Sequence, residues 1–565
     1  MKRNKILEFL TFIACISAIV VILHIIIQSS EDNDDDDVLA RILYYIQTLY
    51  VDKVDARRLA DVAIRAMLNK LNDPHSTFHD AESAQRLEEP MRGSTYGIGI
   101  AFEMFADTLY IWDIAHDSSA QKAGLMSGDR IIYINDTLVA GVQMNRAEIE
   151  NRLSGERGAS KDLKVLRRDV PDLMNFQVIT GSIPVRSVTA AYMVADSIGY
   201  IRLNIFSRRS AEEFIAAVNE LQEQGMVNLI FDLTYNGGGD LGNVYDIANE
   251  FLERERRVYF FRSRDDGIRN WIARHAGSMH TGNLVVLVNE RSMSGSEMFA
   301  GAMQDWDRGV IVGRRTYGKG TAQRWIPLDD GSMLRLTSGE FFTPIGRSVR
   351  KFGYDCEEEA FNRNVEAHIL TYKISAAGVD VPDEWVHQLD SAKFTTLVNK
   401  RRLIGGGGIF PDYVVPENTI RTGLFNNLGR NGIFWKIAIS KVDNNRNELL
   451  KRYPDAKTFK ANYQLPPIVI RRLRQMAEEA EIEWNNQQFE ASRSLILTRI
   501  KAYMARDLYS PSAFNLIMTK ENEIFQAGLR IISDPEKYEN LLKGIGAKSV
   551  LQVPIDEYNY TDIEQ

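Results

Sequence analysis

The stretch NLVVLVNERSMSGSEMFAG, residues 283–301, joins a run of apolar residues to a run of small ones. Its first part, NLVVLVNE, has the continuous apolar pattern of a strand buried on both faces. Its second part, SMSGSEMFAG, places Ser292, Ser294 and Ser296 at the expected start of a helix. Serines in such a position have two ordinary explanations, a helix cap or a nucleophile. The surrounding sequence is needed to decide between them.

Strand and helix patterns alternate on both sides of this stretch. Strand patterns at residues 198–206, 227–233 and 309–313 enclose helix patterns at residues 210–225 and 243–253. In the first helix, Ser210 and Glu213 have the spacing of a capping box. The alternation predicts a mainly parallel sheet covered by helices, within a domain at residues 181–416. An insertion near residues 351–404 is not assigned to the sheet.

Lys319, in the segment RTYGKGTAQ at residues 315–323, is the candidate base for a serine nucleophile. An ordinary lysine has a pKa of about 10.4 and is a poor base at neutral pH. Burial lowers a lysine pKa by up to about 3–5 units, because it disfavours the ammonium form. A neutral amine is then able to take the proton of a serine hydroxyl. Gln323, four residues further on, is expected to orient the amine.

Each of these features has a simpler explanation when it stands alone. A serine-rich helix start is usually a cap, and a lysine between two glycines is usually solvated. A phosphate-binding loop does not fit, because Gly320 follows Lys319 where that motif needs Ser or Thr. A Ser-His-Asp protease is the enzymatic alternative, but none of the eight histidines lies in a matching motif.

A separate pattern precedes this domain at residues 90–180. In DSSAQKAGLMSGDRIIYIND, residues 117–136, a short helix from Ser118 to Lys122 is expected to end at Gly124, and a tight turn follows at Gly128. A second helix ends near residue 155, and KDLKVLRR supplies the last expected strand. This order resembles a PDZ domain, which captures the carboxyl termini of other chains. The resemblance implies a carboxylate-binding loop made of Tyr96, Gly97, Ile98 and Gly99, for which a plain hairpin turn is the alternative.

The amino terminus predicts a membrane anchor. The basic residues MKRNK precede an apolar run at residues 6–27, which as a helix would span about 33 Å. The acidic segment EDNDDDD follows it, so residues 1–5 are expected to form a cytoplasmic stub and the bulk of the chain to lie in the periplasm. A cleaved signal peptide is the alternative, but the apolar run is long and no small-residue cleavage site follows it. Cys15 is interpreted as a membrane-buried thiol and not as a lipoprotein site.

Composition limits the remaining possibilities. A chain of 565 residues is too long for a single hydrophobic core. A content of 44% hydrophobic and 25% charged residues is ordinary for a globular protein. A net charge of −8 argues against a general nucleic-acid binder. Two cysteines are too few for a disulfide framework, and no metal-ligand cluster is present in the sequence. Helical patterns dominate residues 38–88, where two helices are expected between Val38 and Leu71, and residues 417–565.

Residues 289–323 resemble the active-site segment of the carboxyl-terminal processing proteases, also called tail-specific proteases. The segments FDLTYNGGGDLG, LTSGEFFTPIGRSV, GGGGIFPDYVV and LNDPHSTF are similar to further segments of that family, so the likeness covers about residues 40 to 416. The carboxyl-terminal helical region is similar to that of members from Bacteroidetes. Two positions depart from the family pattern: Thr234 stands where an arginine is common, and Gly295 where an alanine is common.

The resemblance implies a role for each residue of the site. Ser294 is the nucleophile, Lys319 the base and Gln323 its support, while Glu297 is the supporting glutamate of the family motif. Backbone N–H groups of Gly238 and Gly295 form the oxyanion hole, with Gly239 as the alternative to Gly238.

The sequence therefore predicts a multidomain α/β (α+β) serine endopeptidase without metal or cofactor. It is expected to be a single-pass protein of the inner membrane that binds protein or peptide substrates by their carboxyl termini and cleaves them through an acyl-enzyme. A homo-oligomer or an activating partner stays open. The alternative is a membrane-tethered PDZ adaptor whose protease-like domain is inactive, although intact Ser294, Lys319 and Gln323 argue against it.

Overall fold

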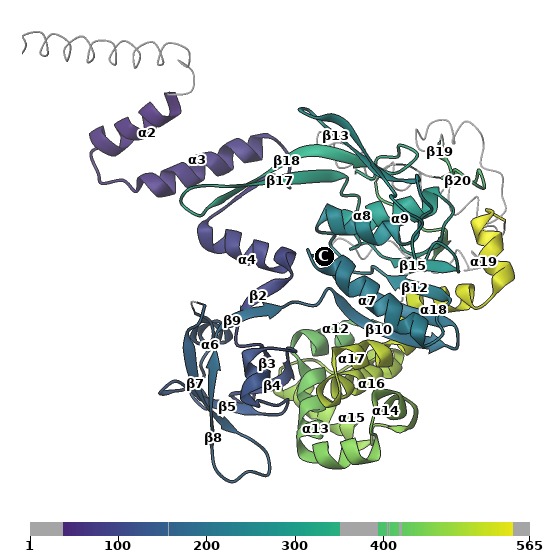
Figure 1. Ribbon diagram of the computed structural model, residues 1–565. Helices are drawn as coiled ribbons and strands as arrows, with labels where there is room; N and C mark the ends of the chain where they lie inside the picture. The colour runs from purple at the N-terminus through teal and green to yellow at the C-terminus, as the bar shows by residue number, and fades with distance from the viewer. Residues whose placement is uncertain are drawn as a thin grey trace, which may run out of the picture. The chain divides into compact units, whose positions relative to one another are not determined.

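A computed structural model gives the arrangement of helices and strands (Figure 1). It describes residues 38–350 apart from residue 156, and residues 394–545 apart from residues 404, 406 and 417–420. The chain divides into two compact units, one from residues 1–79 and 325–336 and the other from residues 80–324 and 337–565.

The expected anchor at residues 6–27, the stub at residues 1–5 and most of the insertion near residues 351–404 lie outside the described residues. Within the described ranges, no helix combines the length and the apolar character needed to cross a bilayer. The membrane anchor therefore stays a prediction.

The first unit contains the two helices that the sequence predicts before the NDPHS break. They are α2 (Val38–Leu49) and α3 (Ala56–Lys70), and the Asp55 side chain caps α3 by accepting a hydrogen bond from the N–H of Arg58. After the break, strand β1 (Thr77–His79) pairs antiparallel with residues 333–335 at the start of β18 (Met333–Phe342).

The second unit begins with helix α4 (Ala81–Arg92) and a small sheet of order β3-β4-β5-β7-β8, with β6 beside β5. Gly124 ends the short helix α5 with a φ of 87°, as the sequence predicts, whereas Ser118, expected as its first residue, is its N-cap. The sequence predicted β7 as the last strand of this domain, and that prediction was wrong. Strand β8 follows β7 in the same sheet, and β9 then pairs with β2. The elements are β2 (Ser94–Gly97), β3 (Ile100–Phe105), β4 (Thr108–Ile114), α5 (Ser119–Ala123), β5 (Arg130–Ile134), β6 (Thr137–Leu138), α6 (Arg146–Leu153), β7 (Ser160–Leu166), β8 (Met174–Ile179) and β9 (Gly181–Pro184).

The central sheet of the second unit has the order β10-β11-β12-β15-β16-β21. Only β10 runs antiparallel to its neighbour, which confirms the predicted mainly parallel sheet. Its strands and the helices between them are β10 (Val188–Ala195), β11 (Ile198–Leu203), α7 (Ser210–Glu223), β12 (Asn228–Asp232), α8 (Leu241–Asn249), β15 (Leu284–Val288), α9 (Gly295–Asp305), β16 (Val310–Gly313) and β21 (Tyr413–Val414).

Helices cover both faces of this sheet (Figure 1). Phe231 of β12 packs into a core with residues of α7, α8 and α9, whereas its neighbour Ile230 packs into a second core with residues of α18 (Glu523–Ile532) and α19 (Pro535–Leu542). Successive strand residues point to opposite faces. The continuous apolar runs of β12 and β15 follow from this burial on both sides.

The chain between α8 and β15 contributes two strands to an antiparallel sheet. In that sheet β13 (Arg257–Ser263) pairs with β14 (Gly267–Ile272) on one side and with residues 339–342 of β18 on the other. Strand β17 (Thr321–Pro327) also pairs with β18, and two short strands, β19 (Phe394–Thr395) and β20 (Arg402–Leu403), pair with each other.

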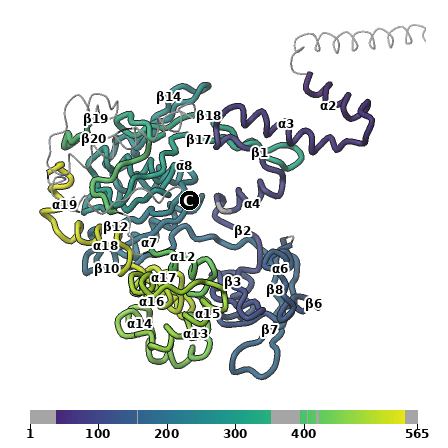
Figure 2. The backbone as a smooth tube through the Cα atoms, turned by 180° about the vertical axis from the view of Figure 1, so that it is seen from behind, coloured from purple at the N-terminus to yellow at the C-terminus, as the bar shows by residue number. Residues whose placement is uncertain are grey.

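The described carboxyl-terminal region, residues 421–545, is helical (Figure 2), and most of it has its own apolar core. The residues of that core include Leu428, Ile437, Leu473 and Ile496, all of which are buried. The helices are α12 (Gly423–Arg430), α13 (Ile433–Arg452), α14 (Ala456–Asn462), α15 (Ile468–Glu479), α16 (Asn486–Leu508), α17 (Pro511–Met518) and the 3₁₀ turn η2 (Thr519–Glu521).

The predicted capping box of α7 was wrong. Arg209 is the N-cap residue and makes no side-chain cap. The Glu213 carboxylate instead accepts hydrogen bonds from the N–H groups of Ser187 (2.7 Å) and Val188 (3.0 Å), while the Ser210 hydroxyl accepts one from Ser207. Donors that tertiary structure brings to Glu213 therefore replace the local cap.

Candidate active site

Ser294 lies in the turn between β15 and α9, at the carboxyl edge of the central sheet. It is the N-cap residue of α9, with φ 56° and ψ −113°, and its side chain is nearly buried. Residues other than glycine rarely adopt such a conformation, which is held at a cost of about 1–3 kcal/mol and is often found at active sites.

The other two serines have structural hydrogen bonds. The Ser292 hydroxyl donates to the carbonyl of Leu233 (2.8 Å), and the Ser296 hydroxyl donates to the carbonyl of Asn236 (2.9 Å). Both tie the turn to the loop that follows β12. Ser294 is thus the serine of the three that combines a strained backbone with a position at the mouth of the helix.

Glu297 connects the segments that carry Ser294 and Lys319. One oxygen of its fully buried carboxylate accepts hydrogen bonds from the N–H groups of Ser294 (2.8 Å) and Lys319 (2.8 Å). The other oxygen accepts from the Thr316 hydroxyl (2.6 Å) and the Gly318 N–H (2.7 Å). One oxygen atom of Glu297, Oε2, therefore holds the backbone N–H groups of both predicted reacting residues.

Burial raises the pKa of Glu297, whereas these four hydrogen bonds lower it, and the net direction is upward. All four contacts come from donors, so they stabilise the ionised form, which accepts at both oxygens. The sequence motif implied a supporting role for Glu297, and its four contacts place it between the segments of Ser294 and Lys319.

Lys319 lies in the loop between β16 and β17. Lys319 is partly buried. The carbonyl of the neighbouring Gly320 accepts a hydrogen bond from the N–H of Phe341. Gln323 follows on β17, where its amide nitrogen donates to the hydroxyls of Thr321 (3.0 Å) and Thr337 (3.2 Å). The expected orienting contact between Gln323 and the Lys319 amine stays a prediction.

The glycine loop after β12 lies directly against the Ser294 turn. A Cβ added to Gly238 would lie 2.8 Å from both the Gly295 nitrogen and the Ser294 Cβ. The Gly238 N–H, however, donates to the Asn236 side-chain oxygen (2.8 Å). Gly239 follows with a φ of 143°, and a Cβ there would collide with the Phe206 carbonyl. Gly295 and both candidate loop glycines are therefore brought together, while Asn236 competes for the Gly238 donor.

Asn236 is a site residue that sequence reasoning did not identify. Its carbonyl accepts hydrogen bonds from the Met293 N–H (3.0 Å) and the Ser296 hydroxyl, and its side-chain nitrogen donates to the Leu203 carbonyl. It thus holds the glycine loop, the Ser294 turn and β11 together. The sequence pointed to Asn236 only through the Asn-Gly pair in TYNGGG, which is typical of a turn.

Arg202 and Asp232 form a second unexpected cluster at the same edge. They are opposite residues of the parallel strands β11 and β12 and are joined by an ion pair of 3.1 Å. Asp232, which is fully buried, also accepts hydrogen bonds from the Tyr200 hydroxyl (2.6 Å) and from the N–H and hydroxyl of Thr234. The arginine also donates to the Thr234 carbonyl (3.3 Å), immediately before the loop that faces Ser294.

The expected carboxylate-binding loop is divided between two structures. Tyr96 and Gly97 end β2 and pair with Ser182 and Gly181 of β9. Ile98 is buried, and its carbonyl accepts from the N–H of Ala120 in α5. Gly99 has a φ of 91°, and any Cβ would collide with Ser118. Ile98 and Gly99 therefore form the turn before β3, while the first two residues belong to a strand.

Comparisons with known proteins match four parts of the chain. Residues 197–357 match peptidase family S41, and residues 86–165 match the PDZ domain. Residues 27–83 match the amino-terminal domain of the activating protease CtpB, and residues 424–510 match a family of unknown function.

Curated relatives agree with these matches. The chain is 32% identical over 310 residues to the carboxy-terminal processing protease CtpB of Bacillus subtilis, covering 54% of this chain and 64% of that protein. It is 30% identical over 312 residues to the carboxy-terminal-processing protease of Bartonella bacilliformis, covering 54% of this chain and 71% of that protein. A solved photosystem II D1 C-terminal processing protease is 28% identical with a TM-score of 0.32, over 55% of this chain and 84% of that one.

The resemblance to the carboxyl-terminal processing proteases is confirmed by the family and domain matches together with the extent of the Bartonella alignment. The segment that matches peptidase family S41 contains Ser294, Glu297, Lys319 and the glycine loop. The chain therefore belongs to the carboxy-terminal processing proteases of peptidase family S41.

Proposed function

We propose that the protein is a serine endopeptidase that captures other proteins by their carboxyl-terminal tails and cleaves them with Ser294 and Lys319. The observation that carries this proposal is the shared Glu297 oxygen, which accepts from the backbone N–H of both residues at 2.8 Å. A helix cap alone needs the first of these contacts. The second contact, to a loop beyond β16, has its use in holding a base beside a nucleophile.

The chemistry follows from a lysine acting in its neutral form. Lys319 takes the proton of the Ser294 hydroxyl as the oxygen attacks the scissile carbonyl. The N–H of Gly295 and one N–H of the glycine loop stabilise the resulting oxyanion. Lys319 then protonates the leaving amine, and water attacks the acyl-enzyme and restores Ser294. No metal or cofactor takes part in these steps.

The glycine-loop donor is either Gly238 or Gly239. The Gly238 N–H already donates to Asn236, so its use requires sharing that hydrogen atom or releasing it when substrate binds. Gly239 is the alternative because it follows in the same loop beside Phe206.

The PDZ domain supplies the recognition step in this proposal. A substrate tail adds a strand to the sheet edge, and its terminal carboxylate accepts from backbone N–H groups near Ile98 and Gly99. The apolar run at residues 6–27 supports the further proposal that the chain is anchored in the inner membrane with this part in the periplasm. Cell fractionation, with protease treatment of spheroplasts, tests that location.

Cleavage of an unfolded protein with an apolar carboxyl-terminal tail tests the mechanism. We expect Ser294→Ala and Lys319→Ala each to reduce kcat by about 10⁴-fold, because each removes a reacting group. The surface variants Ser278→Ala and Lys436→Ala serve as matched controls, and circular dichroism checks that all four variants fold.

The outcomes separate the two functions considered. Activity that survives in both site variants would refute the Ser-Lys mechanism. A folded wild-type protein that neither cleaves nor reacts with a fluorophosphonate probe, yet binds the tail, would identify the non-catalytic adaptor.

A further inference from the structure

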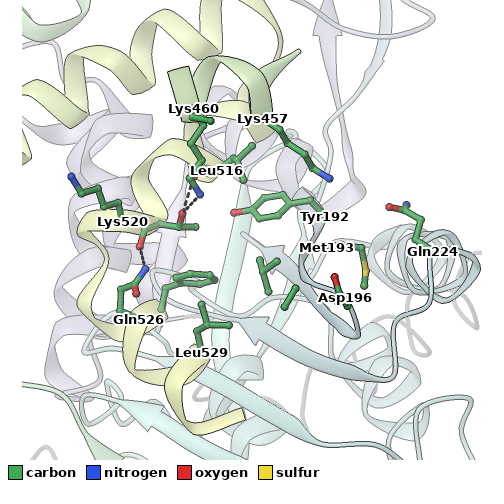
Figure 3. A pocket seen from close by; sticks show the side chains of 15 residues that line it. Tyr192, Met193, Asp196, Gln224, Lys457, Lys460, Leu516, Lys520, Gln526 and Leu529 are labelled. Carbon is green, nitrogen blue, oxygen red and sulfur yellow. Dashed lines mark hydrogen bonds between the residues drawn. The ribbon is translucent and has the colours of Figure 1, made fainter. Parts of the chain in front are cut away.

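A pocket of about 900 Å³ lies between β10, the edge strand of the central sheet, and the helices α14, α17 and α18 (Figure 3). None of its lining residues belongs to the Ser294 site or to the PDZ domain. Apolar side chains form part of its wall, among them Met193, Leu516, Phe525 and Leu529. A volume of this size suits a small organic ligand.

Three lysines line the pocket. Lys457 and Lys460 come from α14, and Lys520 comes from η2. The acidic lining residue, Asp196, lies with Gln224 on the side opposite Lys460 and Lys520 (Figure 3). Lys520 is 4.0 Å from Glu521, but that carboxylate also accepts hydrogen bonds from Ser494 and Thr498.

Lys460 is solvent-accessible and has no acidic partner in the described part of the chain. Its ammonium donates to the Thr519 hydroxyl (3.1 Å), and that hydroxyl donates onward to the Leu516 carbonyl. Burial lowers the pKa of Lys460, and repulsion from Lys520 and Lys460 adds to burial in lowering the pKa of Lys501 behind it. An anion bound among these lysines would relieve their mutual repulsion.

Tyr192 supplies an unused donor on the facing wall. Its hydroxyl is buried and has no hydrogen-bond partner among the described residues. The ring projects from β10, and the hydroxyl points toward the side of the pocket that Lys460 occupies (Figure 3). Burial raises the pKa of Tyr192, so the hydroxyl keeps its proton and is able to donate. A buried donor without an acceptor costs about as much as a lost hydrogen bond.

We propose that this pocket binds an organic oxyanion, with a carboxylate or phosphate head held by Tyr192 and Lys460 and an apolar body against Leu516 and Phe525. Lys457 and Lys520 add attraction from the rim. An oxyanion accepts several charge-assisted hydrogen bonds at once, which matches donors that come from two separate elements. The site does not depend on the catalytic residues, so it stands or falls apart from the proposed peptidase activity.

Isothermal titration calorimetry on the full chain tests the proposal with four soluble probes. They are 4-phenylbutyrate, benzyl phosphate, the neutral 4-phenylbutyramide and inorganic phosphate. We expect one of the two organic anions to bind at least about tenfold more tightly than the neutral amide, because the amide lacks the charge that Lys460 would compensate. The anion that binds more tightly identifies the head as carboxylate or phosphate.

Variants assign the binding to this pocket. Lys460→Gln is expected to weaken the affinity for the preferred anion by about tenfold, and Tyr192→Phe by about fivefold. Lys436→Gln on α13 is the matched control and should leave the affinity unchanged, because Lys436 does not line the pocket. The proposal would be overturned if neither organic anion binds, or if the neutral amide binds as tightly as the organic anions. Unchanged affinity in both pocket variants would also overturn it. If Lys460→Gln fails to fold, Tyr192→Phe alone decides.

Discussion

The backbone of Ser294 needs support from its neighbours, because φ 56° and ψ −113° are unfavourable for a residue with a Cβ. The Glu297 carboxylate supplies part of that support through the Ser294 N–H. Gly238 supplies another part by its lack of a side chain, since the loop backbone approaches the Ser294 Cβ and the Gly295 nitrogen closely.

Replacing Gly238 with alanine is expected to lower kcat by about 100-fold, the typical loss of one oxyanion-hole donor. The new Cβ would lie 2.8 Å from the Gly295 nitrogen, the Ser294 Cβ and the Met293 carbonyl, and it would push the loop away from the turn. Steady-state kinetics with a tailed substrate measure the effect.

Gly346→Ala is the matched control, because Gly346 has a φ of 93° and open space around its Cβ position, while Gly238 has a φ of 88°. Both alanines carry a similar backbone cost of about 1–2 kcal/mol in stability. Similar losses of kcat in the two variants would show that strain, and not the approach to Ser294, explains the effect.

At this scale the sequence predicted the residues that carry local signals. Ser294 and Glu297 stand in a helix-start motif, and the glycines stand in a loop after a buried strand. Asn236 and Arg202 were missed because their roles depend on which segments meet, and single-residue patterns carry no record of such contacts. The placement of Gly238 was predicted, but its hydrogen bond to Asn236 was not.

Among the secondary-structure elements, the carboxyl ends of β11 and β12 act together on the loop that follows β12. Arg202 and Asp232 face each other across these parallel strands, and Arg202 also donates to the Thr234 carbonyl. Thr234 leads into Tyr235, whose φ is 64° and whose N–H donates to the Asn289 side chain. The pair of strands therefore fixes the start of the glycine loop.

Arg202→Lys is expected to lower kcat about tenfold with KM nearly unchanged. A lysine keeps the charge beside Asp232 but has its donors on one nitrogen and lacks the planar guanidinium fork, so it does not also hold the Thr234 carbonyl. Loss of loop positioning affects the transition state more than ground-state binding. Kinetics with a tailed substrate, together with the thermal unfolding midpoint, measure the effect.

Arg262→Lys is the corresponding control and should leave kcat unchanged, because Arg262 is an exposed residue of β13 that pairs with Glu340 of β18. An unchanged kcat in Arg202→Lys as well would remove the positioning role and leave Arg202 as a stabilising residue.

Prediction of elements from sequence succeeded where periodicity was strong. The buried strand β15 and the alternation around it gave the parallel sheet, and Gly124 gave the end of α5. The capping box of α7 failed because Glu213 accepts from the N–H groups of Ser187, which precedes β10, and of Val188, its first residue. A local motif is a weak guide where tertiary donors compete for the same carboxylate.

At the scale of the whole second unit, helices of the segment that matches a family of unknown function contact the PDZ domain. The Tyr110 hydroxyl of β4 donates to Asp507 of α16 (2.9 Å), and Arg130 of β5 donates to Asp443 of α13 (2.7 Å). Helix α13 is kinked at Asn445, two residues beyond Asp443. These contacts suit a segment that holds the PDZ domain in a fixed orientation.

Two acidic residues of this contact are expected to respond oppositely to removal of their charge. Burial raises the pKa of Asp507 to about 6, although Arg446 and Arg506 oppose the shift and Asp443 adds to it. The folded state therefore binds this proton more tightly than the unfolded state, and stability falls as pH rises from about 4 to about 6 and stays lower above that range. Asp443, in contrast, accepts from Arg130 and lies 3.5 Å from Arg168.

We therefore expect Asp507→Asn to stabilise the protein at pH 7 by up to about 3 kcal/mol, with the gain vanishing near pH 4. The amide has no charge to bury, and its oxygen still accepts from Tyr110. Asp443→Asn should destabilise the protein at pH 7 by about 1–3 kcal/mol, because two arginines lose their charged acceptor. Urea unfolding of both variants and the wild type at pH 4.5 and 7, with hydrogen exchange of the β4 amides, measures these effects. If both variants shift stability in the same direction at pH 7, charge burial at Asp507 does not govern this contact, and the PDZ domain is held by packing alone.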